Sequence, residues 1–234
     1  MSIRGIFPID KWGFTNRSVL TNLPEDELAA LTEHMTEEIY KKGQIIFREG
    51  GYPTGIYLVL EGKVKKYKVD KDGREQIIYV ANKGELLGYH ALLSEECYPD
   101  GAAVIENSNI AFIPSGDFLK VLDQSRELSR RLLKTLSHEF AVFANSIFLI
   151  GQKSVRERFA MQLVLMREKY KQNFVPGMAV EINMSREDLA SLVGTARENI
   201  VRILKDFKDE GILETKARKI RILDVHKLLN VASQ

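Results

Sequence analysis

The chain has 234 residues, of which 44% are hydrophobic and 28% are charged, and this balance excludes a disordered chain and favours a globular protein of one large or two ordinary domains. The formal net charge is only +2, but residues 153–234 contain 16 Lys and Arg against 11 Asp and Glu, whereas the rest of the chain contains 18 against 21. The positive C-terminal part is where a nucleic acid would be held.

Cysteine usage and hydropathy exclude several kinds of site. Cys97 is the only cysteine, so neither an intrachain disulfide nor a four-thiolate zinc or iron–sulfur site can form within one chain. The longest uncharged run, residues 140–152, is shorter than the roughly 20 residues that cross a bilayer. No secretory signal opens the sequence. We therefore expect a cytoplasmic protein with no membrane partner.

After a helical segment around residues 24–34, short apolar runs separated by turn signals predict β-strands from about residue 39 to residue 113. Asp72-Gly73 predicts a hairpin with a tight primed turn, because both residues tolerate a positive φ. Strands at this spacing indicate a barrel or a sandwich. A metal-dependent cupin enzyme is an alternative for such a barrel, but it needs several His and carboxylate ligands, and His90 is the only histidine in this region.

Residues 126–151 predict one long helix with a narrow apolar stripe. The heptad spacing of this stripe favours the seam of a parallel homodimer, and an amphipathic helix on its own core is the alternative. The seam residues are Leu133, Leu136, Phe140, Phe143, Ile147 and Ile150. Gly151-Gln152 predicts an interruption and a hinge. The chain is therefore divided into residues 1–125, 126–152 and 153–234.

The third part begins with a helix over residues 155–169, which Pro176-Gly177 separates from two short helices. Ser185-x-x-Asp188 is a helix-start signature, in which a hydroxyl satisfies a free backbone N–H. Gly194 suits the left-handed residue that ends a helix, and Thr195-x-x-Glu198 is a second start signature. Two short helices joined in this way form a helix-turn-helix.

The second of these helices has two distinct faces. Ile200, Ile203, Leu204 and Phe207 fall on one side and are expected in the core, whereas the opposite side is charged. An Arg can donate two hydrogen bonds to guanine and a Glu can accept one from cytosine, so we expect this side to read G·C pairs. The base-reading residues are Arg197, Glu198 and Arg202. The alternative is a solvated face with a Glu198–Arg202 pair.

A β-hairpin wing is predicted over residues 212–223, with a basic turn at residues 215–219. Basic and hydroxyl side chains around the helix-turn-helix suit contacts to phosphate, which anchor a protein on DNA without reading sequence. The residues expected to contact the DNA backbone are Ser185, Thr195, Lys205, Lys216, Arg218 and Lys219.

The segment Gly194-Thr195-Ala196-Arg197-Glu198-Asn199-Ile200-Val201-Arg202-Ile203-Leu204 resembles the recognition segment of the CRP/FNR family of bacterial transcription regulators. Gly43-x-x-Ile46-Phe47-x-Glu49-Gly50 resembles the β-roll sensor domain of that family, and the resemblance covers nearly the whole chain. It implies an α+β fold with an N-terminal antiparallel β-roll (cupin-like and cyclic-nucleotide-binding-like), a long dimerisation helix and a C-terminal winged helix-turn-helix. It also implies half-sites resembling TGTGA, read by a homodimer, and a contact with RNA polymerase.

The sensor segment departs from this family's pattern. Cyclic-AMP-binding members carry an Arg-Ser pair after Gly-Glu-Leu, but here residues 87–104 contain no Lys or Arg and Tyr98-Pro99-Asp100-Gly101 occupies the expected place. A pocket without a cation binds a cyclic phosphate poorly, so no cyclic AMP is expected and the effector is unknown. The candidate pocket residues are Gly84, Glu85, Leu86, His90, Tyr98 and Asp100.

Two further alternatives stay open at this point. A four-cysteine iron–sulfur cluster is not expected, but haem could take axial ligands from Tyr89, His90, Cys97 or His138. A sensor module that regulates a protein partner without binding DNA is the second alternative, against which the helix-turn-helix and its wing argue.

Overall fold

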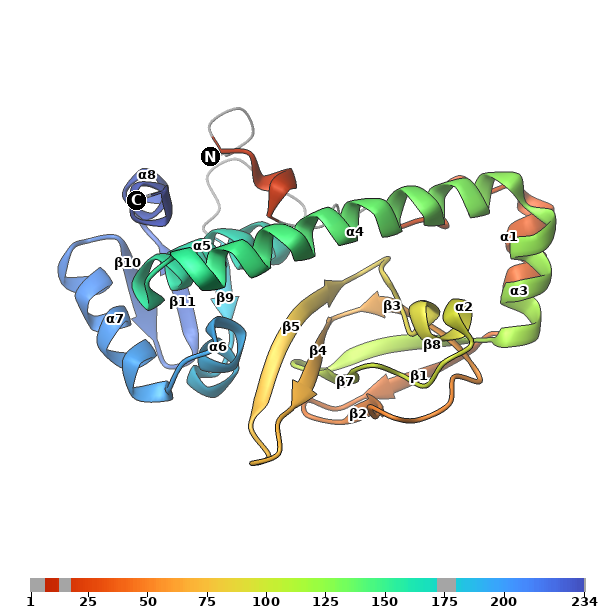
Figure 1. Ribbon diagram of the computed structural model, residues 1–234, viewed down its shortest axis with the longest axis horizontal. Helices are drawn as coiled ribbons and strands as arrows, with labels where there is room; N and C mark the ends of the chain where they lie inside the picture. Colours follow the sequence, from red (N-terminus) through yellow and green to blue (C-terminus); the bar gives the residue numbers. More distant parts are fainter. Residues whose placement is uncertain (1–6, 13–17, 172–179, 234) are drawn as a thin grey trace. The chain divides into compact units, whose positions relative to one another are not determined.

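The computed structural model describes residues 7–12, 18–171 and 180–233, so the predicted break at Pro176-Gly177 lies outside the described residues. The chain forms two compact units, one made of residues 16–138 and the other of residues 1–15 together with residues 139–234 (Figure 1).

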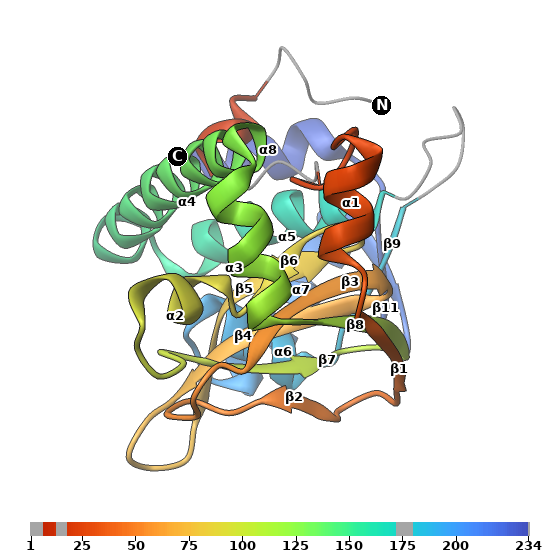
Figure 2. The same cartoon turned by 90° about the vertical axis from the view of Figure 1, so that its right-hand side faces the viewer.

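The first unit is an antiparallel β-roll built from two four-stranded sheets (Figure 2). One sheet has the order β1 (Thr36–Tyr40), β8 (Ser108–Pro114), β3 (Gly55–Glu61) and β6 (Leu86–Leu87). The other has the order β2 (Ile45–Phe47), β7 (Gly101–Val104), β4 (Lys63–Val69) and β5 (Glu75–Asn82). The predicted β-structure over residues 39–113 is confirmed and extends slightly at both ends.

Two apolar clusters stabilise this unit. One lies between the sheets and includes Val59, Val64 and Ile110. The other lies beneath the helices, where Leu31 and Phe118 pack on the outer side of the first sheet. The helices of the roll are α1 (Glu25–Leu31), α2 (Tyr89–Ser94) and α3 (Ser115–Gln124). Both clusters bury residues that the short strands present at alternate positions, as expected for strands with one face in a core.

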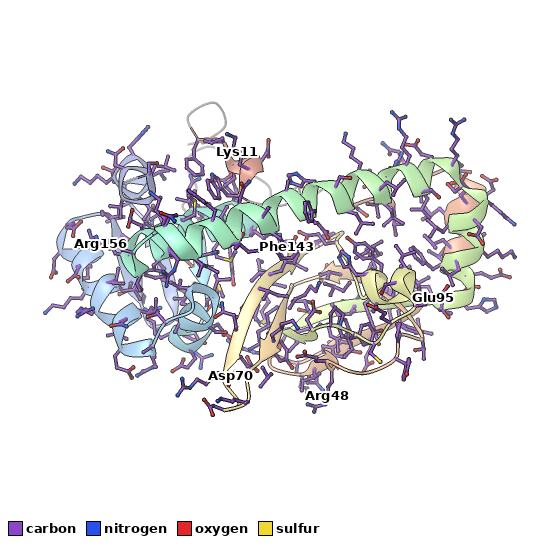
Figure 3. All side chains as sticks on the ribbon, viewed as in Figure 1. Lys11, Arg48, Asp70, Glu95, Phe143 and Arg156 are labelled. Atoms are coloured by element: carbon purple, nitrogen blue, oxygen red, sulfur yellow. The ribbon has the colours of Figure 1, made fainter. Side chains whose placement is uncertain are left out.

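The β4–β5 hairpin is confirmed, but the predicted two-residue primed turn is wrong. The strands pair as far as Val69 and Glu75, and Gly73 is the residue of the turn with a positive φ (+77°). The carboxylate of Asp70 at the tip (Figure 3) accepts hydrogen bonds from the backbone N–H groups of Asp72 and Arg74 at 2.8 and 2.9 Å. This side chain replaces missing backbone partners and stabilises a longer turn.

The long helix α4 (Arg126–Gln152) confirms the predicted helix. Gly151-Gln152 does not interrupt it, because both residues belong to its last turn. The break follows at Ser154, whose hydroxyl accepts a hydrogen bond from the Glu157 N–H while the Glu157 carboxylate bonds the Ser154 N–H. This reciprocal cap starts a new helix.

The predicted seam residues of α4 are not equally exposed. Leu133, Phe140, Ile147 and Ile150 are 66%, 76%, 72% and 64% exposed. Leu136 is half-buried against the helix-covered cluster of the roll, and Phe143 (Figure 3) is also half-buried. The stripe therefore exposes four large apolar side chains on one helix.

The second unit surrounds α5 (Val155–Tyr170), which packs against α8 (Val225–Ser233). Its other helices are the 3₁₀ turn η1 (Ile9–Lys11), α6 (Arg186–Val193) and α7 (Arg197–Asp209). A small antiparallel sheet has the order β10 (Leu213–Lys216), β11 (Lys219–Ile222) and β9 (Glu181–Asn183). Helix α8 and strand β9 were not predicted from the sequence.

Gly62 provides a stability test of the roll. Its φ is +88°, and a Cβ there would lie 2.1 Å from the Ser108 Oγ and 2.8 Å from the Ser108 Cα. We expect Gly62→Ala to lower the free energy of unfolding by about 3 kcal/mol, through backbone strain and overpacking together. Gly73→Ala is the control, because its φ is +77° but its Cβ would meet nothing within 4 Å. Gly73→Ala should lower the free energy of unfolding by about 1–2 kcal/mol. Equal losses in urea unfolding would contradict the steric explanation.

Candidate nucleic-acid interface

The helix-turn-helix begins with a side-chain cap and ends its first helix with a glycine. The Ser185 hydroxyl accepts a hydrogen bond from the Asp188 N–H at 2.9 Å and donates one to the Asp188 carboxylate at 2.7 Å. Gly194 has a φ of +72° and donates its N–H to the Ala190 carbonyl. Both features confirm the predicted start and end of α6.

The second predicted cap is wrong. Helix α7 begins at Arg197 with Ala196 as its N-cap, and no side chain caps it. Thr195 stays in the turn because its N–H donates to the Ala190 carbonyl at 3.1 Å. Its hydroxyl instead accepts a hydrogen bond from the side-chain amide of Asn199 at 3.0 Å.

The two faces of α7 are those predicted. Ile200, Ile203, Leu204 and Phe207 are buried. The opposite side is exposed to solvent and carries Arg197, Glu198, Val201, Arg202, Lys205 and Lys208. An exposed row of this composition can donate and accept hydrogen bonds in a DNA groove.

Arg197 carries an ion pair to the preceding helix. Its Nε lies 2.7 Å from the Glu187 Oε1. The backbone N–H of Glu187 donates a hydrogen bond to the Glu187 carboxylate. This hydrogen bond, together with the charge of Arg197, lowers the pKa of the Glu187 carboxyl below its usual value. Glu187 therefore bears a negative charge at neutral pH at the start of α6.

Arg202 does not form the pair with Glu198 that a solvated charged face would predict. Its Nη2 donates to the Asn199 Oδ1 at 3.2 Å, and Asn199 in turn donates to Thr195. The structure therefore pairs Arg202 with Asn199 and not with Glu198. This chain of hydrogen bonds leaves the Glu198 carboxylate available at the exposed face.

The wing is a tighter hairpin than predicted. Thr215, Lys216 and Lys219 belong to the paired strands, and the turn consists of Ala217 and Arg218. The Nη2 of Arg186 donates to the Ala217 carbonyl at 3.1 Å, which ties the wing tip to the first turn of α6.

Three basic residues of the wing differ in their availability for phosphate. Lys216 and Arg218 are exposed, whereas the Lys219 Nζ lies 2.6 Å from the Glu181 carboxylate. The hydrogen bond from Lys219 lowers the pKa of the Glu181 carboxyl. A phosphate would have to displace this carboxylate to bind Lys219 directly.

Tyr98, one of the candidate effector-pocket residues, is part of the packed interior of the roll. Its ring stacks on Phe47 with centroids 4.0 Å apart, and its backbone bonds Gly50 and Gly51 at 2.9 and 2.8 Å. Burial raises the pKa of its hydroxyl above the ordinary value. Gly88 also approaches this ring, because a Cβ there would lie 3.1 Å from it.

The rest of the Gly84-Glu85-Leu86 segment is also engaged in the roll. The Gly84 N–H donates to the Val59 carbonyl at 2.7 Å, and the Glu85 carboxylate accepts a hydrogen bond from the Tyr79 hydroxyl. Leu86 packs partly against the helix-covered cluster.

The prediction that the pocket beside residues 87–104 lacks a cation is wrong. Asp100 is buried, and its carboxylate lies 3.1 Å from the Nζ of Lys66, which comes from strand β4. Residues 87–104 indeed contain no Lys or Arg, but the sheet brings Lys66 beside this segment, since Lys66 pairs with Ala102 in the β4–β7 ladder. Asp100 neutralises that cation within the roll.

The residues considered for haem lie in different surroundings. Tyr89 is buried in the helix-covered cluster and stacks on His90 with centroids 4.1 Å apart. Cys97 is half-buried and unbridged. Within residues 7–12, 18–171 and 180–233, no three His, Cys, Asp or Glu side chains gather as a metal site would require. The helices of the described part include none long and apolar enough to cross a membrane.

Sequence reasoning missed four residues of these two regions. Glu187, Asn199 and Arg186 hold the side chains or the wing of the candidate interface, and Lys66 pairs with Asp100 in the roll. The one local signal was the acid at the start of α6, which is also typical of ordinary helix capping.

Comparisons with known proteins match both units. A family model described as a cyclic nucleotide-binding domain matches residues 37–125, and one described as a Crp-like helix-turn-helix domain matches residues 157–231. The transcriptional activator protein anr of Pseudomonas aeruginosa is 26% identical over 192 residues, which cover 82% of this chain and 78% of that protein. The fumarate and nitrate reduction regulatory protein of Vibrio cholerae is 26% identical over 211 residues, which cover 90% of this chain and 84% of that protein.

A solved structure agrees over most of the chain. FixK2 from Bradyrhizobium japonicum superposes with a TM-score of 0.74 and 26% identity, covering 84% of this chain and 96% of that one.

The Lys66–Asp100 pair gives a second stability test. Asp100→Asn leaves a buried ammonium without its counter-ion and should lower the free energy of unfolding by about 3 to 5 kcal/mol. The double change Lys66→Met with Asp100→Leu removes both charges and should recover most of that loss. Urea unfolding of the three proteins measures this. A double variant as unstable as Asp100→Asn would show that the ion pair is not the cause.

Proposed function

The chain belongs to the CRP/FNR family of transcription regulators, and we propose that it binds DNA as a homodimer that reads a palindrome with half-sites resembling TGTGA. The observation that carries this proposal is the outer face of α7, which presents Arg197, Glu198 and Arg202 to solvent while its inner face is buried. In a helix-turn-helix, the first turns of the second helix enter the major groove.

The three side chains suit G·C pairs. The guanidinium groups of Arg197 and Arg202 match the O6 and N7 acceptors of guanine, and the carboxylate of Glu198 can accept from the cytosine amino group. Each arginine already has one polar neighbour, Glu187 or Asn199. Such a neighbour limits the directions in which the guanidinium can point.

Phosphate contacts would anchor the motif on the duplex. We assign these to Lys205, Lys216, Arg218 and Lys219, with the displacement of Glu181 as a cost at Lys219. Among the hydroxyls, Thr195 accepts from Asn199 and keeps its own O–H to donate to a phosphate oxygen. Ser185 already donates to Asp188, so it would contribute less.

The homodimer would form along α4. The proposed seam consists of Leu133, Leu136, Phe140, Phe143, Ile147 and Ile150. Four of these side chains are mostly exposed in the single chain, and a row of large apolar side chains on one helix face is typical of a partner interface. The heptad spacing suits a second, parallel copy of the same helix.

Residues 1–125 would then sense an effector, residues 126–152 would hold the dimer, and residues 153–234 would bind DNA. We propose that cyclic AMP is not the effector, because residues 87–104 supply no cation and the neighbouring Lys66 is already paired with the buried Asp100 at 3.1 Å. A cyclic phosphate would have to break that ion pair to find its cation. Contact with RNA polymerase and a cytoplasmic location follow from the family.

Selection of binding sites from a random duplex library tests the proposal. The purified, ligand-free protein should enrich a palindrome whose half-sites lie about one helical turn apart. Enrichment without a palindrome would contradict the homodimer, and recovery of unrelated sequences alone would contradict base reading by α7.

Arg197→Ala should relax the preference at one G·C pair of each half-site and weaken binding by about 1–3 kcal/mol. Arg218→Ala is the control, because a phosphate contact should weaken all duplexes alike and lower the salt slope by about 1. Fluorescence anisotropy with the selected duplex and its single-base variants measures both. An Arg197→Ala protein that keeps every base preference would contradict the reading role.

Ile147→Asp should convert the homodimer to a monomer at micromolar concentration, because each copy would place a carboxylate in the apolar seam. Ile39→Asp is the control, since Ile39 is 77% exposed on the edge strand β1 and lies outside the seam. Light scattering of both variants measures the mass. A dimeric Ile147→Asp protein would rule out this seam.

A further inference from the structure

The ion pair between Glu187 and Arg197 joins the two helices of the helix-turn-helix. Glu187 is the second residue of α6 and Arg197 is the first residue of α7. Their side chains are 67% and 54% exposed and meet at 2.7 Å. Apart from Glu198, the charged side chains on the exposed side of α7 are cations, so Glu187 adds a second carboxylate to a surface proposed to bind DNA.

The contact uses one particular edge of the guanidinium. The Glu187 Oε1 lies 2.7 Å from the Nε of Arg197, whereas guanine O6 and N7 can accept hydrogen bonds from the two terminal nitrogens, which form a rigid fork. The ion pair therefore leaves that fork available. It also restricts the plane and direction of the guanidinium before DNA arrives.

Glu187 does not depend on Arg197 alone for its place. Its carboxylate bonds its own backbone N–H at the start of α6, where the helix dipole favours an anion. A carboxylate held in this way can order the arginine side chain before DNA binds. A long side chain that is already ordered loses less conformational freedom when it binds.

We infer that Glu187 is a positioning residue that aims Arg197 at guanine and raises the sequence specificity of the protein. This inference rests on the proposed reading role of Arg197. Glu187 acts in two ways that favour specificity. It orients the fork for a correct G·C pair, and in a non-specific complex it holds Arg197 in the ion pair, so that the arginine does not bind a phosphate there.

The inference predicts effects of opposite sign in Glu187→Gln. Discrimination at the G·C pair assigned to Arg197 should fall about threefold, the size of effect that an exposed ion pair supports. Binding to random-sequence DNA should tighten, with the salt slope steeper by about 1 because Arg197 gains a phosphate to neutralise. A residue that merely stabilised the turn would weaken binding to all duplexes alike.

The test compares Glu187→Gln, Arg197→Ala and the double variant by anisotropy, on the selected duplex, on duplexes with each G·C pair replaced, and on random DNA in a salt series. Glu214→Gln is the matched control. It removes an equal charge from the same unit, but its partner is Arg221 at 3.3 Å. The control should leave every base preference unchanged. Glu187→Ala provides a second variant should the first unfold, and it should show the same two effects.

Two results overturn the inference and can be told apart. If Arg197→Ala loses a base preference but Glu187→Gln keeps it, Glu187 does not position Arg197. If Arg197→Ala loses no preference, the reading role itself fails and the inference fails with it. In the supporting result, Glu187→Gln changes no base preference once Arg197 is Ala, because the two residues act through the same contact.

Discussion

The burial of Phe207 determines which side of α7 faces solvent. Its ring is fully buried and stacks on Phe159 of α5, with centroids 6.1 Å apart, and the Arg156 guanidinium covers it at 4.6 Å. Successive residues of an α-helix are about 100° apart. Once Phe207 and Ile200 point inward, Glu198 and Arg202, which lie roughly 140 to 180° away from them around the helix axis, must point outward. Arg197 lies nearer the buried side, in the first turn of the helix, and its side chain is 54% exposed. The candidate interface therefore depends on an aromatic contact that no DNA would touch.

The parts of the second unit that follow from local chemistry could be predicted from the sequence. The cap at Ser185 and the left-handed Gly194 involve neighbouring residues only, and both are confirmed. The cap expected at Thr195 is wrong because the turn already bonds its backbone to Ala190. The Glu187–Arg197 pair joins two helices across that turn, so no pattern within one helix could reveal it.

In the roll, too, a contact between residues far apart in the sequence could not be predicted from a local pattern. Alternating apolar runs predicted the strands, and the hairpin at Gly73 was found although its turn was misjudged. The pairing of Lys66 with Asp100 depends on which strands become neighbours, here β4 and β7. Charge counted along residues 87–104 cannot show a cation that arrives from another strand. Helix α8 did leave a local signal, since Leu228, Leu229 and Ala232 are buried at helical spacing.

In the proposed complex, Arg197 donates hydrogen bonds to the guanine edge in the major groove. The most direct measurement replaces one guanine of the half-site at a time with 7-deazaguanine, which lacks the N7 acceptor and leaves base pairing intact. We predict that one such position weakens binding by the parent protein, and that the same replacement has no further effect on Arg197→Ala. Unchanged affinity of the parent protein for every substituted duplex would rule out this role of Arg197.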